Sequence, residues 1–315
     1  MTTRRAPSIV VVGSSNTDMI VRLPRLPRAG ETLLGGEFLT AAGGKGANQA
    51  VGAARAGGRV TFIARVGRDV FGDQAIAGLR RDGIQVTHVS RDPAAPSGVA
   101  LIFVGRGGEN SIAVAGGANG LLRPADIRNA AKVIRSAALL VVQLETPLTT
   151  VAAAIETAVH AGVKVILNPA PARPLPRALL GGVSILTPNE TEAELLTGIR
   201  VTNERAAARA CVKLRARGVG TVVLTLGSRG AFVADAAGGR IVPGFKVKAV
   251  DTTAAGDIFN GALAVALAEG GALHDAVRFA NAAAALSVTR LGAQPSAPTR
   301  AQIDALLSRG RQRVR

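Results

Sequence analysis

The sequence predicts an α/β protein in which a mainly parallel central sheet is covered by helices on both faces. Short runs rich in β-branched residues alternate with longer helix-like segments through most of the chain, and from Ile258 onward the pattern is helical. That alternation is typical of parallel strands joined by crossover helices. A chain of 315 residues, 48% of them hydrophobic, is long enough to bury a substantial core.

Each predicted strand is a short run in which Val, Ile and Leu dominate. In chain order the predicted strands cover residues 8–13, 60–67, 138–145, 163–168, 183–186 and 221–227. The predicted helices between them cover residues 47–56, 71–81, 124–135, 148–161 and 204–217. The last part of the chain is predicted to form helices over 258–271, 272–290 and 299–308.

Two Gly-rich regions break the alternation. Residues 18–39 and 97–114 are strand-like but have no helix between neighbouring runs. We expect these regions to form a small antiparallel sheet that projects from the main domain. Such a sheet could act as a lid, with lid segments at about 14–40 and 97–116.

The composition limits the classes of function. A formal net charge of +17 would suit a nucleic-acid partner. The basic residues are scattered, however, and the chain has no Trp or Tyr and 8 Phe, so base stacking is poorly supported. We therefore expect no nucleic-acid partner. A basic surface that attracts anionic substrates such as nucleotides fits better.

The cysteine content and the apolar runs indicate the compartment. The single cysteine, Cys211, excludes an internal disulfide framework and is typical of a reducing environment. No apolar run approaches the roughly 18–20 residues of a membrane span. We expect a cytoplasmic protein without a membrane partner, built as one domain over residues 8–310 with flexible tails at 1–7 and 311–315.

The stretch "AAGGKGANQA", residues 41–50, is the first candidate for ligand binding. Paired glycines let the backbone approach a ligand, and the following helix would point its free amides at it. The stretch departs from both common nucleotide motifs, because Gly46 follows Lys45 where the Walker pattern has Ser or Thr, and Gln49 stands where the dinucleotide pattern has a third glycine. A glycine turn before a helix is the structural alternative.

Polar residues also follow several predicted strands. Asn16 and Asp18 come directly after the first strand, and Glu145 falls at the end of the third. Ligands of parallel α/β sheets lie at the carboxyl ends of the strands, so these side chains are placed to bind a polyhydroxy compound. A role in stabilising turns is equally compatible with each residue taken alone.

Two further stretches follow later strands. Asn189, Glu190 and Glu192 begin a predicted helix, where the helix dipole explains one acidic residue and where three polar residues could hold hydrated Mg²⁺ beside phosphates. The stretch 225–231 is not a serine-hydrolase elbow, because Leu226 occupies the first glycine position. No His/Cys cluster suggests zinc.

The stretch "KAVDTTAAGDIFNGA", residues 248–262, raises the question of what Asp257 does. Small residues before it leave backbone amides free to form an anion-binding nest at a helix start. A carboxylate beside such a nest could accept a hydroxyl proton while the amides stabilise a transferring phosphoryl group. Taken alone, the stretch is equally compatible with Asp257 as a helix cap.

Together these stretches resemble the ribokinase branch of the PfkB carbohydrate kinase family, nearly end to end. The stretches that carry the resemblance are "GSSNTD", "PRAGET", "GGKGANQA", "LNPAPAR", "TPNETEAELLTGI", "TLGSRG", "DTTAAGDIFNGAL" and "GAQPS". The resemblance implies a Rossmann-like ribokinase fold with a β lid that also forms the contact of a homodimer. It implies ATP-dependent phosphorylation of D-ribose at the 5-hydroxyl.

The resemblance also implies site residues. Asp257 would be the catalytic base, with Ala255 and Gly256 in an anion hole over 254–257. The implied sugar ligands are Asn16, Asp18, Gly44, Lys45, Gly46, Ala47, Asn48, Glu145 and Asp257. The implied ATP contacts are Asn189, Thr225, Leu226, Gly227, Ser228, Arg229, Gly230, Ala255, Gly256 and Asn281.

Two metal ions follow from the same resemblance. Asn189 and Glu192 would organise Mg²⁺ and phosphate. An activating K⁺ would lie in a loop formed by Asp251, Thr253, Ser287, Arg290, Gly292 and Ser296. Asp251 would thereby have a role separate from that of Asp257.

The sequence departs from familiar ribokinases at Ile258, where Thr is usual, and at Asn281, where some have His. We expect Ile258 to pack behind the helix start and Asn281 to affect nucleotide preference. Another PfkB kinase, acting on deoxyribose or a nucleoside, is the alternative enzyme. A sugar-sensing or nucleic-acid-binding protein that had lost catalysis would have a damaged site, whereas Asp257, Gly256 and Lys45 are intact.

Overall fold

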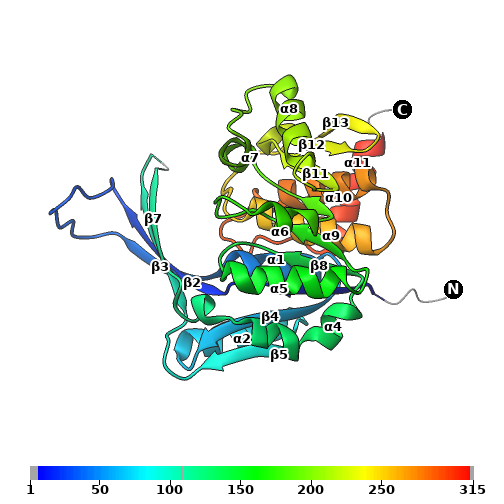
Figure 1. Ribbon diagram of the computed structural model, residues 1–315. Helices are drawn as coiled ribbons and strands as arrows, with labels where there is room; N and C mark the ends of the chain where they lie inside the picture. The colour runs from blue at the N-terminus through cyan, green and yellow to red at the C-terminus, as the bar shows by residue number, and fades with distance from the viewer. Residues whose placement is uncertain (1–5, 108, 313–315) are drawn as a thin grey trace.

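The computed structural model describes residues 6–107 and 109–312 and has a large central sheet between two layers of helices (Figure 1). The strand order of the central sheet is β13-β12-β11-β10-β9-β8-β1-β4-β5. Its parallel strands are β1 (Ser8–Val12), β4 (Arg59–Gly67), β5 (Gln85–Asp92), β8 (Leu139–Val142), β9 (Lys164–Leu167), β10 (Ile185–Leu186) and β11 (Thr221–Thr225). An antiparallel hairpin, β12 (Gly230–Asp235) and β13 (Gly238–Pro243), forms one edge.

Alternate residues of the central strands enter two separate cores. In β1, Ile9 and Val11 belong to one core, and Val10 and Val12 belong to the other, because successive side chains point to opposite faces. One face is covered by α1 (Lys45–Arg55), α2 (Val70–Arg81), α9 (Ala255–Ala268), α10 (Leu273–Ser287) and α11 (Arg300–Gln312). The other is covered by α3 (Pro124–Asn129), α4 (Ala131–Arg135), α5 (Leu148–Val159), α6 (Arg177–Gly181), α7 (Glu190–Thr197) and α8 (Glu204–Arg215).

The fold class predicted from the sequence is confirmed, with local differences. The predicted helix over 124–135 is wrong as a single element, because the backbone leaves helical geometry at Ala130 and α3 and α4 are separate. Strands β5, β12 and β13 were not predicted. The edge strands β5 and β13 are rich in polar residues or glycine, and β12, next to the edge, is a short strand of mostly small residues. The predicted tails fall mostly outside the described residues, and α11 continues through Gln312.

A second sheet of four strands stands away from the helical body (Figure 1). Its order is β3 (Glu37–Gly43), β2 (Asn16–Leu23), β6 (Gly98–Gly105) and β7 (Asn110–Ala115). The predicted small sheet is therefore present, but the expectation that it is antiparallel is wrong for its middle pair, because β2 and β6 are parallel. Both strands leave the carboxyl ends of parallel strands, β2 after β1 and β6 after β5, and so they run in the same direction.

Helices α1 and α9 pack closely because glycines lie between them. A Cβ added to Gly261 would lie 2.5 Å from the carbonyl oxygen of Gln49, and one added to Gly52 would lie 3.2 Å from Cα of Ile258. Ile258 is 1% exposed, which confirms that it packs behind the start of α9. This close approach brings the first turns of both helices to the same edge of the central sheet.

Within 6–107 and 109–312, every helix is too short or too polar to cross a membrane.

Candidate active site

Asp257 lies on the first turn of α9 and is almost completely buried, with 6% of its surface exposed. Its Oδ2 accepts a hydrogen bond from Nδ2 of Asn48 at 3.1 Å, and its Oδ1 accepts one from Nε2 of Gln49 at 2.9 Å. Burial raises the pKa of Asp257 above its ordinary value, against the opposing effects of Lys45 and the two amides. A carboxylate with a raised pKa is better suited to accept a proton than an ordinary surface aspartate.

The backbone beside Asp257 is open. Ala254, at the N-cap of α9, has a φ of 57°, and it is the one non-glycine residue with positive φ in the described chain. This left-handed residue turns the chain so that the first amides of α9 have no partner within the helix. Gly256 is exposed, and a Cβ added to it would meet no atom within 4 Å. The start of α9 thus has open space at Gly256, while the amide of Ala255 makes one long bond, 3.3 Å, to the carbonyl of Thr252.

Four acidic side chains from separate parts of the chain act on Lys45: Asp18, Glu145, Glu192 and Asp257. Burial by itself lowers the pKa of Lys45, but Asp257 and Glu145 lead a group of carboxylates that outweigh this effect and raise it. Burial, followed by the charges of Glu145 and Asp257, raises the pKa of Asp18 to about 6. The structure thus brings together one ammonium group and four carboxylates that the sequence places far apart.

Glu145 ties this group to the start of α1. Its Oε2 accepts a hydrogen bond from the backbone nitrogen of Lys45 at 2.9 Å and another from the hydroxyl of Ser14. The hydroxyl of Ser14 also accepts a weak bond from the amide of Gly46 at 3.3 Å. Ser14 was not predicted as a site residue, although it lies in the "GSSNTD" stretch.

The backbone at the start of α1 is packed against the loop after β1. A Cβ on Gly44, whose φ is 88°, would lie 2.7 Å from the nitrogen of Asn16, and one on Gly46 would lie 2.6 Å from the nitrogen of Ser14. Ala47 is buried and donates its backbone N–H to the carbonyl of Ser14. The amides of Gly46 and Ala47 and the carbonyl of Gly44 are thus bonded within the protein, and these three residues hold the start of α1 against the loop after β1.

Asn16 is held in place by a residue that the sequence did not single out. Nδ2 of Asn119 donates to Oδ1 of Asn16 at 2.7 Å, and Asn119 also bonds both backbone groups of Ser15. Asn119 is fully buried in the short 3-10 helix η1 (Gly117–Leu121). An isolated asparagine in a Gly-rich stretch carries no local signal for this role.

Asn189 and Glu192 form a reciprocal cap at the start of α7. The carbonyl oxygen of the Asn189 side chain accepts from the backbone of Glu192 at 2.8 Å, and a carboxylate oxygen of Glu192 accepts from the backbone of Asn189 at 2.8 Å. The predicted helix start is confirmed. Burial raises the pKa of Glu192, although the hydrogen bond from the amide of Asn189 and the positive charge of Lys45 both act to lower it.

The predicted nucleotide stretch over 225–230 follows β11 and contains the 3-10 helix η2 (Gly227–Arg229). Leu226 is 3% exposed, so its side chain belongs to the core, and only its backbone can meet a nucleotide. Arg229 is exposed and forms an ion pair with Glu190 of α7. Asn281 uses its side-chain nitrogen to bond the carbonyls of Val242 and Pro243, at 3.0 and 3.1 Å, which ties α10 to β13.

The two segments predicted to hold K⁺ lie side by side. The carboxylate of Asp251 accepts from the amides of Thr253 and Gly292, both at 2.8 Å, and the carbonyl of Val288 accepts from the amide of Asp251 at 3.2 Å. The hydroxyls of Ser287 and Ser296 donate to nearby backbone carbonyls. Both carboxylate oxygens of Asp251 are thus engaged by backbone amides. Arg290 instead directs its side chain to Gln302.

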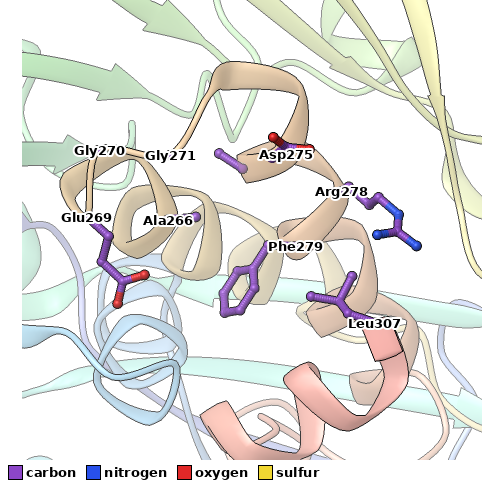
Figure 2. Close-up of a pocket in the computed structure, with 9 residues that line it drawn as sticks. Ala266, Glu269, Gly270, Gly271, Asp275, Arg278, Phe279 and Leu307 are labelled. Carbon is purple, nitrogen blue, oxygen red and sulfur yellow. The ribbon is translucent and has the colours of Figure 1, made fainter. Parts of the chain in front are cut away.

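Metal-binding clusters of three or more His, Cys, Asp or Glu side chains are absent from the described part of the chain. A separate hollow lies between the turn after α9 and helix α11, as Figure 2 shows. It is lined by side chains that include Glu269, Asp275, Arg278, Phe279 and Leu307. Because none of the predicted site residues lines it, this hollow is distinct from the candidate active site.

The pfkB family carbohydrate kinase model matches residues 6–300 of the chain. The chain belongs to this family. It is 46% identical over 293 residues to a ribokinase of Haemophilus influenzae, covering 93% of this chain and 96% of that protein. It is also 41% identical over 304 residues to a deoxyribokinase of Salmonella typhi, covering 95% of this chain and 98% of that protein.

The fold of this PfkB chain is also similar to solved structures. It aligns with the structure of an Arabidopsis thaliana ribokinase complexed with ribose and ATP at a TM-score of 0.89 and 35% identity, covering 96% of this chain and 99% of that one. A Thermotoga maritima ribokinase aligns at a TM-score of 0.88 and 38% identity, with coverage of 96% and 99%. The fold assigned from the sequence agrees with both.

Proposed function

We propose that the protein transfers the γ-phosphoryl group of ATP to the 5-hydroxyl of D-ribose, giving D-ribose 5-phosphate and ADP. The observation that carries the proposal is the buried carboxylate of Asp257 beside the open helix start at Gly256. The ribokinases among its relatives, and the neighbour complexed with ribose and ATP, support the same reaction.

In this reaction Asp257 accepts the proton of the 5-hydroxyl as that oxygen forms a bond to the γ-phosphorus. The bond between the γ-phosphorus and the bridging oxygen breaks, and ADP leaves. The amide of Gly256 stabilises the negative charge of the transferring group from the start of α9. The amide of Ala255, which bonds the carbonyl of Thr252 at 3.3 Å here, would join it by exchanging that long bond for one to the phosphoryl group. Asn16, Asp18 and Lys45 hold the sugar from the opposite side.

Two cations belong to the proposal. Asn189 and Glu192 would lie on the side of the site where Mg²⁺ binds with ATP, and the ion would neutralise phosphate charge there. K⁺ would be held by the loop around Asp251, whose oxygen atoms suit a hard cation. Because ATP and sugar phosphates are used inside the cell, we place the reaction in the cytoplasm.

We further propose that the four-stranded sheet is a lid through which two copies of the chain form a homodimer. Several large apolar side chains of this sheet are exposed in the single chain: Phe38, Leu101, Ile112 and Val114. By strand register, Phe38 and Leu101 lie on one face of the sheet and Ile112 and Val114 on the other. Burial of either face against a second copy would remove apolar surface from water. The sheet stands away from the body, where a partner can reach it (Figure 1).

A substrate panel tests the proposed reaction. Turnover with MgATP is measured for D-ribose, 2-deoxyribose, fructose and nucleosides in a coupled ADP assay, and kcat/KM is expected to be highest for D-ribose. Higher kcat/KM for 2-deoxyribose would instead favour the activity of the deoxyribokinase relative. Turnover of nucleosides alone would overturn the assignment of a free pentose.

A further inference from the structure

The side chain of Gln49 connects Asp257 to the ends of the central strands. Gln49 is fully buried in α1. Its Nε2 donates to Oδ1 of Asp257 at 2.9 Å and to Oδ1 of Asn168 at 3.0 Å, while its Oε1 accepts from Nε2 of Gln143 at 2.7 Å. Because the Asp257 carboxylate accepts when ionised, the nitrogen of Gln49 must face it, which fixes the orientation of the amide.

The hydrogen bonds continue from Gln49 around a closed path. Nδ2 of Asn168 donates to the carbonyl of Thr187 at 3.2 Å, and the hydroxyl of Thr187 donates to Oδ1 of Asn260 at 2.7 Å. Nδ2 of Asn260 then donates to the carbonyl of Gly256 at 2.8 Å. We call Gln49, Asn168, Thr187 and Asn260 the amide circuit. It returns to the peptide next to the base, and all four side chains are buried.

We propose that Gln49 is a positioning residue that fixes the carboxylate of Asp257 for proton transfer, and that Asn168 holds Gln49 in this role. The inference rests on the proposed function, since it takes Asp257 as the general base. The terminal torsion of an aspartate is soft, so a donor that is itself held from behind is needed to keep one carboxylate orientation. Asn48 also bonds Asp257, but it is a predicted sugar ligand, whereas the partners of Gln49 all lie within the protein.

The contact also affects the charge of Asp257. Lys45 favours ionisation of Asp257, while Glu145, Asp18 and Glu192 face it as like charges. An N–H donated to a carboxylate favours the ionised form. Loss of the Gln49 donor should therefore raise the pKa of Asp257 further, so that a higher pH is needed to ionise the base.

The test uses Gln49→Met, which keeps the length of the side chain but removes the amide. With MgATP and D-ribose, kcat is expected to fall by about 10- to 100-fold with little change in KM for ribose. The acid limb of the kcat profile is expected to move to higher pH. Asn168→Ala, which leaves the contact with Asp257 in place but frees Gln49, is expected to produce smaller changes in the same directions.

Thr150→Val is the matched control. Thr150 is a fully buried residue of α5, outside the site, and its hydroxyl donates to the carbonyl of Leu122. Removing this bond is expected to lower the unfolding midpoint without moving the pH profile. A purely structural role for Gln49 would give the same pattern as this control.

The outcomes separate this inference from the proposed function. If folded Gln49→Met keeps the wild-type kcat and acid limb while Asp257→Asn is inactive, the positioning role is wrong and the proposed base stands. If Asp257→Asn keeps its turnover, the proposed base is itself wrong. If circular dichroism shows that Gln49→Met does not fold, the pH profile of Asn168→Ala decides, and an unchanged profile overturns the positioning role.

Discussion

Nε2 of Gln49 lies 2.9 Å from Oδ1 of Asp257, although the two residues are 208 positions apart in the chain. The contact joins the first helix after the Gly-rich loop to the helix that carries the candidate base. It exists because glycines at 52 and 261 allow α1 and α9 to approach closely. The reactivity assigned to Asp257 therefore depends on helix packing as well as on its own position at a helix start.

Replacing the base should stop the chemistry without preventing sugar binding. We expect Asp257→Asn to lower kcat by roughly 10²- to 10⁴-fold, because the amide cannot accept the hydroxyl proton. Calorimetry should still detect D-ribose binding, since Asn16 and Lys45 are unchanged. Near-normal turnover of this variant would remove Asp257 from the role of general base.

The pKa of Asp18, raised to about 6, predicts how sugar recognition depends on pH. The ionised carboxylate is the stronger acceptor for sugar hydroxyls, so kcat/KM for D-ribose should fall as the pH falls through about 6. Asp18→Asn should remove this dependence while lowering kcat/KM at neutral pH. An unchanged pH profile in this variant would assign the titration to another group.

The raised pKa of Asp18 also predicts how the stability of the fold depends on pH. The pKa of Asp18 in the folded state lies above the ordinary value of 3.8. Between about pH 4 and pH 6, Asp18 is therefore protonated in the folded protein but ionised in the unfolded chain. The free energy of unfolding should therefore fall as the pH rises through this window. At pH 7, Asp18→Asn should raise the free energy of unfolding by about 3 kcal/mol in urea titrations. A destabilised variant would contradict this expectation.

Monovalent cations should change the rate. We expect K⁺ to activate turnover more than Na⁺ at equal ionic strength, because the loop around Asp251 supplies oxygens at fixed positions. Asp251→Ala should lose this difference while keeping Asp257 and Gly256. Equal rates of the unaltered protein in the two salts would count against a cation site here.

The proposed dimer depends on the apolar surface of the four-stranded sheet. Phe38 pairs with Val21, whereas Ile112 pairs with Ile102, which in turn pairs with Ile20. Because Ile20 and Val21 are adjacent in β2 and point to opposite faces, Phe38 and Ile112 lie on opposite faces of the sheet. A Phe38→Lys/Ile112→Lys double variant should reduce the mass measured by light scattering to that of one chain. Val212→Lys, at a residue of α8 that is 66% exposed, is the control and should leave the mass unchanged.

Close packing of α1 and α9 can be tested with one methyl group. Gly261→Ala should lower the free energy of unfolding by about 1–3 kcal/mol, because its Cβ would lie 2.5 Å from the carbonyl oxygen of Gln49. Turnover should fall as well, since α9 carries Asp257. Gly181→Ala, whose Cβ would meet no atom within 4 Å, should change stability by less than about 1 kcal/mol in the same urea titrations.

Local patterns in the sequence were sufficient for much of the fold and for part of the site. Hydrophobic runs separated by helical segments predict the central sheet, because strands buried on both faces need continuous apolar residues. The small residues before Asp257 predict a free helix start, and Ala254 provides it with a left-handed backbone. The match to eight ordered motifs predicts the family, to which the chain belongs.

Only the tertiary structure decided which side chains support these residues. Ser14, Gln49 and Asn119 contact predicted site residues that are distant in sequence, so no local pattern distinguishes them from other polar residues. The parallel pairing of β2 with β6 likewise depends on where β1 and β5 end in the assembled sheet. The sequence determines which chemical groups are present, whereas their hydrogen-bond partners depend on strand order and on how closely the helices pack.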